Sequence, residues 1–335
     1  MQKELDEGVE FLTNVTLPSP QYNAVTIVVA VDENYIPHLA ALVESIKSSF
    51  PEDRFLELVV LDGGIKKQSQ ALLEKQFFCN FNHGKINFIN CKGSYQGVAL
   101  NTYFTEAILY RVSAARILPN HKKILYLDTD LIVLSDISEL FDIDLGETYA
   151  AAAAPELYMK VCIKIGSKKR IEKGVKGLSG LPIDKYLQEY LELGKDAAHY
   201  FQSGVMLFNL DYIRASNIEN IIKEDLLKNR YWLPDQDILN KYLKGNVLEL
   251  SLSWNLSAGI RSIYKDLTKE WAEKVDNSIQ LPKIIHYAGN NEKPWKDINT
   301  NFSSFYWFFL RRTFWYEKVL EKLNKKKGLL KFLSF

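Results

Sequence analysis

The apolar positions near the start of the chain follow two different spacings. Residues 24–31 ("AVTIVVAV") and 55–62 ("FLELVVLD") are nearly unbroken apolar runs, as expected of strands buried on both faces. Between them, apolar residues recur at helical spacing from Ile36 to Ile46, and Pro37 suits the first turn of a helix. The pattern predicts strand, helix and strand in succession, which is the repeating unit of a parallel sheet.

This alternation continues to about residue 128. The pattern predicts a polar helix up to about Phe77, a strand over 85–90, a helix near 102–118 and a strand over 123–128. We therefore expect an α/β fold with a mainly parallel sheet flanked by helices. Ligands of such sheets bind beyond the carboxyl ends of the strands. Asp32 and Asp128 both end predicted strands, so we group them as candidate ligand-binding residues.

The second half of the chain is less regular. Strands are predicted over 148–156, 200–210 and 283–289, with helices over 211–229 and 233–243. Residues 157–198 are expected to form an irregular insert rich in Lys and Gly. We expect residues 1–23 to be an amino-terminal extension, 24–300 to be one domain, and 301–335 to be a separate carboxy-terminal segment.

Composition narrows the class of protein. The chain has 335 residues, 47 % of them hydrophobic and 25 % charged, which is typical of a soluble globular protein. Its net charge of +1 does not suggest a nucleic-acid-binding protein. Cys79, Cys91 and Cys162 have neither metal-ligand nor redox spacing, so we expect a reduced, cytoplasmic protein. We expect no signal peptide, because the acidic amino terminus has no apolar core, and no membrane-spanning segment, because no apolar run is long enough.

Two carboxylates stand between two apolar runs in "KILYLDTDLIVL" (123–134). In an extended segment Asp128 and Asp130 would share one side, about 6–7 Å apart, with Thr129 opposite. Their mutual repulsion would be relieved by a divalent cation, which prefers oxygen ligands. Among 41 acidic residues about five such pairs arise by chance, so an ordinary surface turn is the alternative. The position of the pair at a strand end, between apolar runs, favours the cation site. An EF-hand is excluded, because no glycine and no further oxygen ligands follow at the spacing that an EF-hand requires.

Five blocks in fixed order resemble a known family. They are "AVDENY" (30–35), "LYLDTDLIV" (125–133), "YFQSGVMLFNL" (200–210), "PDQDILN" (234–240) and "HYAGNNEKPW" (286–295). Together they are similar to the bacterial branch of glycosyltransferase family 8, the lipopolysaccharide and lipooligosaccharide galactosyl- and glucosyltransferases. The resemblance covers about residues 24–296. It implies a GT-A fold and transfer of galactose or glucose, with retention of configuration, from a UDP-sugar to a cell-surface glycan.

The resemblance also implies a metal site. Asp128 and Asp130 match the Asp-x-Asp motif that holds Mn²⁺ on the donor diphosphate, and His286 matches the third protein ligand. A histidine beside two carboxylates suits Mn²⁺ better than Mg²⁺, which is the alternative ion. For His286 itself, a hydrogen-bonded core histidine is the alternative interpretation.

Further donor-binding residues are implied by position. Ala30, Asp32, Asn34 and Tyr35 match the nucleotide-binding loop, with Asp32 on the uracil. Lys293 matches a lysine that reaches the diphosphate, and Arg111 lies where the family has an arginine that faces a phosphate. Thr129, within the Asp-x-Asp motif, and Gly289, in the last block, are the other candidate donor-binding residues. For Arg111, a solvated charge on a helix is the alternative.

The block "PDQD" supplies the candidate catalytic residues. The family places the residue matching Gln236 beneath the anomeric carbon, and Asp235 and Asp237 flank it. Because an amide is a poor nucleophile, we favour a front-face route in which the departing phosphate helps to deprotonate the acceptor; a covalent sugar trapped on Asp235 or Asp237 would refute it. Charges at a helix amino terminus are the alternative role of the two aspartates.

The chain departs from the family pattern at two places. Three residues rather than two separate Gly289 from Lys293. In the central block, Gln202 and Ser203 stand where relatives often have Asn and Ala. The pocket formed by that block faces the donor sugar and the acceptor, so the family does not indicate which hexose this chain prefers.

Two basic segments suggest partners. Between Tyr158 and Ile183 the insert holds one acid, Glu172, and seven cations, namely Lys160, Lys164, Lys168, Lys169, Arg170, Lys173 and Lys176. This charge suits an anionic glycan or glycolipid acceptor, although a solvated loop explains it without function. Residues 302–316 contain nine aromatics, and residues 305–335 carry eight Lys/Arg against two Glu. This combination suits peripheral attachment to the cytoplasmic face of the inner membrane, with a core-docking helix as the alternative.

Two other functions are the alternatives to a glycosyltransferase: a sugar-nucleotide-binding protein without activity, and a UDP-sugar hydrolase.

Overall fold

The computed structural model describes residues 20–327 apart from residues 22, 101–103, 173–174 and 290. Most of the predicted amino-terminal extension, Lys173 and the last residues of the tail lie outside the described residues. The strands are β1 (Ala24–Val31), β2 (Phe55–Asp62), β3 (Gly84–Asn90), β4 (Lys123–Leu127), β5 (Leu131–Val133), β6 (Ala151–Pro155), β7 (Phe201–Asn209), β8 (Val247–Glu249), β9 (Leu256–Ser257) and β10 (Ile284–His286).

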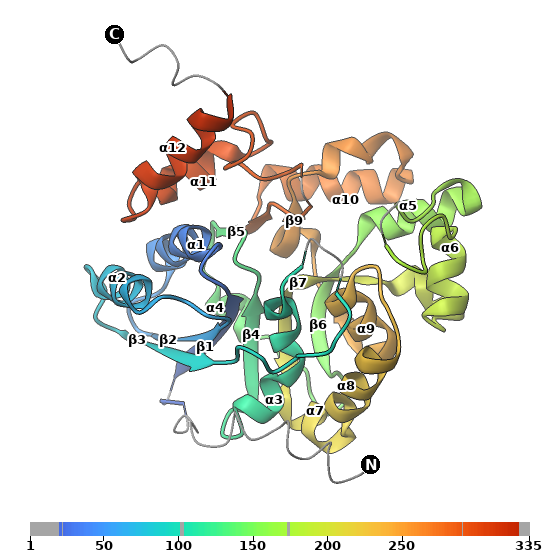
Figure 1. Cartoon of the computed structure of the whole chain (residues 1–335), viewed down its shortest axis with the longest axis horizontal. Coiled ribbons are helices and arrows are strands. Elements are labelled where there is room, and N and C mark those ends of the chain that lie inside the picture. The colour runs from blue at the N-terminus through green and yellow to red at the C-terminus, as the bar shows by residue number, and fades with distance from the viewer. Residues whose placement is uncertain (1–19, 22, 101–103, 173–174, 290, 328–335) are drawn as a thin grey trace.

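Helices cover both faces of the sheet (Figure 1). The α-helices are α1 (Ile36–Ser49), α2 (Lys67–Phe78), α3 (Ala114–Ile117), α4 (Ser138–Phe141), α5 (Leu157–Ile165), α6 (Ile183–Lys185), α7 (Leu210–Ser216), α8 (Ile218–Lys228), α9 (Pro234–Leu243), α10 (Lys269–Gln280), α11 (Ser303–Leu310) and α12 (Tyr316–Lys327). Short 3-10 or π turns are η2 (Glu106–Ser113), η3 (Gly166–Lys168), η4 (Tyr186–Tyr190), η5 (Gly194–His199), η6 (Leu252–Asn255), η7 (Ile260–Ser262) and η8 (Tyr264–Asp266).

The central sheet has seven strands in the order β3-β2-β1-β4-β7-β6-β8. All neighbouring pairs are parallel except those of β7, which runs antiparallel to both β4 and β6. The predicted mainly parallel α/β sheet is therefore confirmed. A second sheet of three strands, β5-β10-β9, starts where the chain leaves β4.

Successive residues of the strands face two different hydrophobic cores. Ile27 and Val29 pack with α1 and α2, whereas Val28 and Tyr126 pack with η2, α8 and α9. Because both faces are covered, the strands can be apolar throughout, which explains the unbroken runs in the sequence. Two buried polar side chains within these strands, Thr26 and Glu57, are bonded to each other, with Thr26 Oγ1 donating to Glu57 Oε2 at 3.1 Å.

Three predicted helical or irregular segments differ from the structure. In place of the helix expected near 102–118, the described residues form the 3-10 helix η2, followed by the short helix α3. The insert over 157–198 is not irregular, because α5 buries Leu157, Met159, Val161 and Cys162, and helical turns follow it. The predicted helix over 211–229 is two helices, α7 and α8, separated at Asn217, whose φ of 53° is left-handed. Asparagine tolerates that conformation, so the apolar pattern continues through the break.

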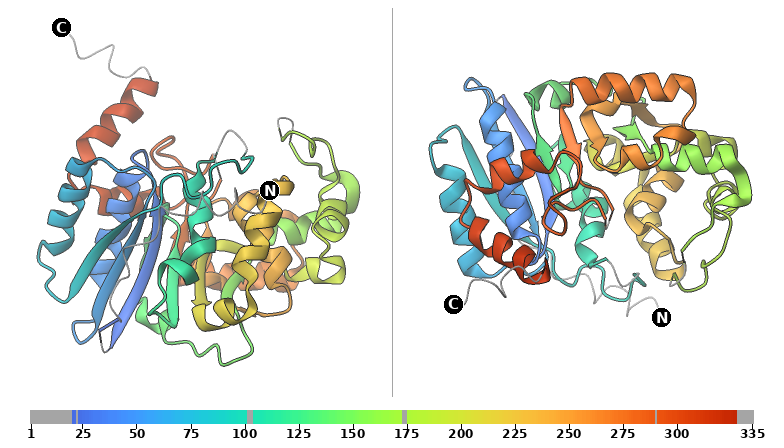
Figure 2. Two further views of the ribbon diagram at one scale, coloured as in Figure 1. Left: turned by 60° about the horizontal axis from the view of Figure 1, so that its bottom comes forward. Right: turned by 90° about the horizontal axis from the view of Figure 1, so that it is seen from above.

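The tail is partly docked on the body. Tyr306, Trp307, Phe309 and Leu310 of α11 are buried in a cluster that includes Ala41 of α1. Figure 2 shows α11 and α12 lying along the α1 side of the molecule. Phe305, Phe308 and Phe314 remain exposed. Among the described residues, no helix is both long and apolar enough to cross a bilayer.

Candidate active site

Asp128 and Asp130 lie where the chain passes from the central sheet to the small sheet. Asp128 follows β4 directly, and its backbone N–H donates to the carbonyl of Gly204 at 2.8 Å. Residues 129–130 form a turn rather than the extended segment that we expected, and Leu131 then pairs with His286. The two carboxylates converge because of this turn and this strand pairing, not because of strand alternation.

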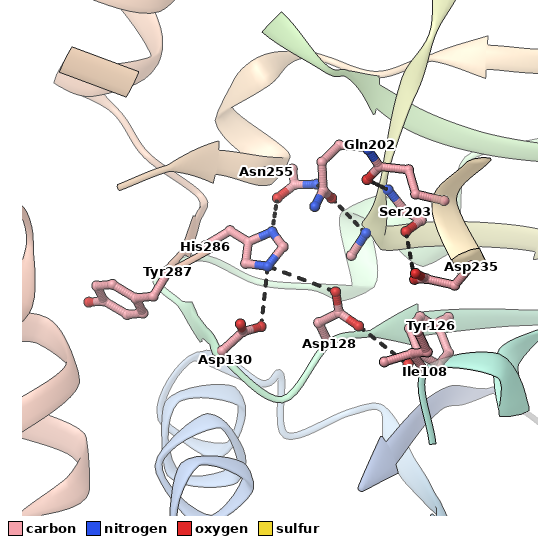
Figure 3. Close-up of polar contacts among 12 residues, drawn as sticks. Ile108, Tyr126, Asp128, Asp130, Gln202, Ser203, Asp235, Asn255, His286 and Tyr287 are labelled. Atoms are coloured by element: carbon pink, nitrogen blue, oxygen red, sulfur yellow. Dashed lines mark hydrogen bonds and ion pairs between the residues drawn. The ribbon is translucent and has the colours of Figure 1, made fainter. Parts of the chain in front are cut away.

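Asp128, Asp130 and His286 form one cluster (Figure 3). One ligand atom from each lies within 4.8 Å of the others. His286 Nε2 is 3.2 Å from Asp130 Oδ1 and 3.8 Å from Asp128 Oδ2. Two carboxylates and an imidazole are a donor set that suits Mn²⁺ and similar divalent ions. The three residues that the sequence grouped as metal ligands are thus together in the structure.

The hydrogen-bond network behind His286 leaves its Nε2 available as a ligand. Its Nδ1 is 2.9 Å from Asn255 Oδ1, while Asn255 Nδ2 donates to Gln202 Oε1 at 2.6 Å. The same Gln202 oxygen accepts the backbone N–H of Gly204 at 2.6 Å, which fixes it as an acceptor. Asn255 must therefore present its own oxygen to His286, so Nδ1 carries the hydrogen and Nε2 keeps its lone pair. These residues fit a bound metal ion.

Gly204 provides the space for this arrangement. A Cβ at this position would collide with the His286 ring and lie 2.7 Å from Asp128 Oδ2. Any larger residue would push apart two of the three candidate ligands, so glycine is required here for close approach.

Arg111 is buried, which excludes the solvated helix charge as its role. Its guanidinium donates to Asp128 Oδ1 at 2.6 Å and to the Ser203 carbonyl at 2.8 Å, and it lies 3.2 Å from Asp235 Oδ2. Burial acts to lower the pKa of Arg111, but Asp128 and Asp235 outweigh burial and raise it. A permanent cation therefore lies beside the cluster of Asp128, Asp130 and His286, and its contact with Asp235 links that cluster to helix α9.

Lys293 brings a second cation to the other side of the cluster. Its ammonium group donates to Asp130 Oδ2 and, at 2.6 Å, to the carbonyl of Tyr287. Burial alone would raise the pKa of Asp130, but the neighbouring positive charge of Lys293 lowers it. Gly289, in the same segment, has a φ of 80°, which glycine adopts without strain.

The loop after β1 lies next to Lys293. Ala30 is near the carboxyl end of β1, and Asp32 Oδ1 accepts the backbone N–H groups of Asn34, at 2.8 Å, and Tyr35, at 3.3 Å. Tyr35 meets Trp295 edge to face, with ring centroids 6.1 Å apart. The predicted nucleotide loop and the predicted diphosphate segment are thus in contact.

Helix α9 presents its first turn to the same region. Asp235 Oδ2 accepts from Ser203 Oγ at 3.1 Å, and Gln236 Oε1 accepts the Ser203 backbone N–H at 3.0 Å. Asp237 is instead fully buried, and its two oxygens accept from Tyr186 at 2.6 Å and Tyr200 at 2.5 Å. Asp235 and Gln236 therefore join the network around the cluster, whereas the carboxylate of Asp237 is engaged by tyrosines.

Glu156 was not identified from the sequence. It follows β6, and its carboxylate accepts the Tyr158 N–H at 3.1 Å at the start of α5. Burial raises its pKa, and hydrogen bonds from the Tyr158 N–H and from Gln236 oppose this shift. Glu156 also lines a pocket with Gln202, Asn255 and His286. A single acid after an alanine run has no recognisable spacing, and only the fold places it beside Gln236.

Comparisons with known proteins agree with this geometry. The model of the family "Glycosyl transferase family 8" matches residues 26–299. General stress protein A of Bacillus subtilis (strain 168) is 28 % identical over 300 residues, covering 86 % of this chain and 94 % of that protein. Lipopolysaccharide 1,2-glucosyltransferase of Escherichia coli (strain K12) is 28 % identical over 278 residues, covering 79 % and 71 %.

Solved structures share the fold. The apo structure of the WbbM bifunctional glycosyltransferase aligns with a TM-score of 0.82 and 25 % identity over 92 % of this chain, which spans 53 % of that protein. The galactosyltransferase LgtC, in complex with donor and acceptor sugar analogs, aligns with a TM-score of 0.66 and 22 % identity over 88 % of this chain and 100 % of that chain. The expected GT-A fold is confirmed. This chain belongs to glycosyltransferase family 8.

Proposed function

We propose that this glycosyltransferase moves galactose or glucose from a UDP-sugar to a cell-surface glycan, such as a lipopolysaccharide or lipooligosaccharide core, with Mn²⁺ as cofactor and with retention of configuration. The cluster of Asp128, Asp130 and His286 carries the proposal, because it combines metal-ligand chemistry with two flanking cations. The curated relative from Escherichia coli, a lipopolysaccharide 1,2-glucosyltransferase, supports the class of acceptor.

In this proposal the donor diphosphate lies between Lys293 and Arg111. A bound divalent ion would neutralise charge on the diphosphate as the sugar–phosphate bond breaks. Lys293 would exchange its contact with Asp130 for one with the leaving phosphate, and Arg111 would hold Asp128 in place. Asp32, Asn34 and the rest of the 30–35 loop would bind the uridine.

The sugar would lie against α9 and the central block. Gln236 is held by the Ser203 backbone, and Asp235 is held by Ser203 and Arg111. We propose that both steady the positive charge that develops on the ring, while the departing phosphate removes the acceptor proton. For Asp237 we propose a positioning role, because its oxygens already bind Tyr186 and Tyr200.

The acceptor side would include the basic insert. Lys168 and Lys169 are exposed, whereas Lys160 and Lys164 donate to backbone carbonyls and Arg170 donates to the Gly180 carbonyl. We propose that the exposed pair attracts an anionic acceptor.

The exposed tail aromatics would attach the enzyme to the cytoplasmic face of the inner membrane. Phe305, Phe308 and Phe314 are exposed next to Arg311 and Arg312, and the Arg312 guanidinium lies 3.7 Å from the Phe308 ring centre. Aromatic and cationic groups together favour an anionic lipid surface.

A donor screen tests the proposal. UDP release is measured with Mn²⁺ for each UDP-hexose, with and without a truncated lipooligosaccharide. A transferase releases UDP faster with the acceptor present. Equal release in both conditions would indicate a UDP-sugar hydrolase, and no release despite tight UDP binding would indicate a binding protein without activity.

A further inference from the structure

His38 joins three segments that are distant in the sequence. It lies on the buried side of α1, where it is 6 % exposed. Its ring stacks on Trp295, with centroids 3.6 Å apart and planes 18° apart, and its Nδ1 is 2.7 Å from the Tyr306 hydroxyl of α11. The first turn of α1, the segment after β10 and the tail helix therefore meet at one imidazole.

The Trp295 side of this junction leads to the candidate donor site. Lys293 Nζ lies 5.5 Å from the Trp295 ring centre, and the same ammonium group contacts Asp130. Tyr35, in the predicted nucleotide loop, packs edge to face on His38, at 5.3 Å, and on Trp295. Burial and the Lys293 charge both lower the pKa of His38, so the imidazole is neutral and can accept or donate one hydrogen bond.

The Tyr306 side leads to the tail. Tyr306 is 2 % exposed and packs on Trp295, at 5.2 Å, and on Tyr287, at 6.0 Å. The Tyr287 carbonyl is the second acceptor of Lys293. Phe305 and Phe308 of the same helix are exposed instead. One face of α11 thus packs on the segment that carries Lys293, and the opposite face is exposed.

We infer that α11 is a structural part of the donor site, in which Tyr306 and His38 are positioning residues that hold Trp295 and, through it, Lys293. The inference rests on the proposed function. A lysine side chain has many rotamers, and the segment from Tyr287 to Trp295 contains neither helix nor strand in its described residues. Fixing that segment before the donor arrives lowers the entropy cost of binding. The tail would then support donor binding without any membrane.

Calorimetry of UDP binding in the presence of Mn²⁺, with the full chain, tests the inference. Tyr306→Phe removes only the hydroxyl group and is expected to weaken UDP binding by about 3- to 10-fold, the range for one lost hydrogen bond. The KM for the UDP-sugar should rise similarly, while the KM for a soluble acceptor should not change. Tyr264→Phe, which removes a hydroxyl that donates to Asp276 at 2.7 Å and has no role in this account, is the matched control and should leave UDP affinity unchanged.

A double-mutant cycle separates positioning from a general loss of packing. If the contact between His38 and Tyr306 transmits the effect, His38→Gln should add little to Tyr306→Phe. Should Tyr306→Phe fail to fold, Trp295→Phe and Trp295→Leu replace it, and only the leucine variant should weaken UDP binding. Wild-type UDP affinity in folded Tyr306→Phe, or in folded Trp295→Leu where that variant replaces it, would overturn the inference. Failure of the unmodified protein to bind UDP would instead contradict the proposed function.

Discussion

Asn255 lies behind His286 and determines which ring nitrogen faces the two aspartates. Its orientation is set by Gln202, whose oxygen also accepts the Gly204 N–H. Gln202 is one of the departures from the family pattern, and here its oxygen is used inside the protein. Gln202, which differs from the family pattern, thus orients His286, a candidate ligand that matches the pattern.

Replacing Asn255 should weaken metal binding without removing a ligand. Asn255→Leu takes away the acceptor for His286 Nδ1 and is expected to lower Mn²⁺ affinity by about 10- to 100-fold. Asn255→Asp, which keeps an acceptor oxygen, is the matched control and should retain most of the affinity. Metal titration by calorimetry measures both. Equal affinity in the leucine and aspartate variants would show that the tautomer is set by something else.

Asp237 gives a pH dependence of stability. Burial raises its pKa from 3.8 to about 6, although Tyr186 and Tyr200 oppose the shift. Since the folded protein holds this proton more tightly than the unfolded chain, the stability from Asp237 is present below about pH 4 and is lost as the pH rises through about 6. From about pH 4.5 to about pH 7 the wild type should lose about 2 kcal/mol of unfolding free energy relative to Asp237→Asn.

Denaturant unfolding of both proteins at the two pH values measures this difference. The comparison cancels the contributions of all other titrating groups, because the two proteins share them. A wild-type protein that gains stability relative to Asp237→Asn over this range would show that the carboxylate is stabilised in its ionised form.

At the scale of elements, the strands that are buried on both faces could be predicted from the sequence. The bounds of β1 and β2 agree with the apolar runs, because burial on both faces leaves a continuous signal. Helix α5 was missed because Lys160 and Lys164 interrupt its apolar positions, and both lysines are bound to carbonyls of neighbouring segments. Glu156 and Asn255 could not be predicted as site residues, since only tertiary packing brings them to Gln236 and His286.

The insert gives a prediction about the acceptor. Lys168→Ala with Lys169→Ala removes two exposed cations and should raise the KM for an anionic acceptor by about 3- to 10-fold, with the donor KM unchanged. The effect should shrink at high salt, because salt screens exposed charges. Lys228→Ala, an exposed cation on α8, is the control. Equal changes in the donor and acceptor KM would argue against this role of the insert.

The tail gives a prediction about membranes. Changing Phe305, Phe308 and Phe314 together to alanine should lower co-sedimentation with anionic vesicles by about tenfold, because these rings provide the exposed apolar area. Truncation is a poor test, since it would also remove the buried residues of α11. Leu281→Ala, which changes a residue 78 % exposed elsewhere, is the control. Unchanged sedimentation of the triple variant would rule out this attachment.

At the scale of the whole molecule, both sheets meet at the cluster of Asp128, Asp130 and His286. The central sheet supplies Asp128 at the end of β4, and the small sheet supplies His286 from β10. Asp130 lies on the turn between them, while Arg111 donates to Asp128 and Lys293 donates to Asp130. The order of the motifs in the sequence identified these residues. Their meeting at one place depends on the pairing of β5 with β10, which no local sequence pattern predicts.

The most direct test of this account is the dependence of UDP affinity on the metal ion. Chelator-treated protein, whose folding is verified by circular dichroism, is titrated with UDP by calorimetry with and without Mn²⁺. We predict that Mn²⁺ increases UDP affinity by about tenfold or more, because the ion would link the diphosphate to Asp128, Asp130 and His286. The same UDP affinity in both conditions would contradict the account.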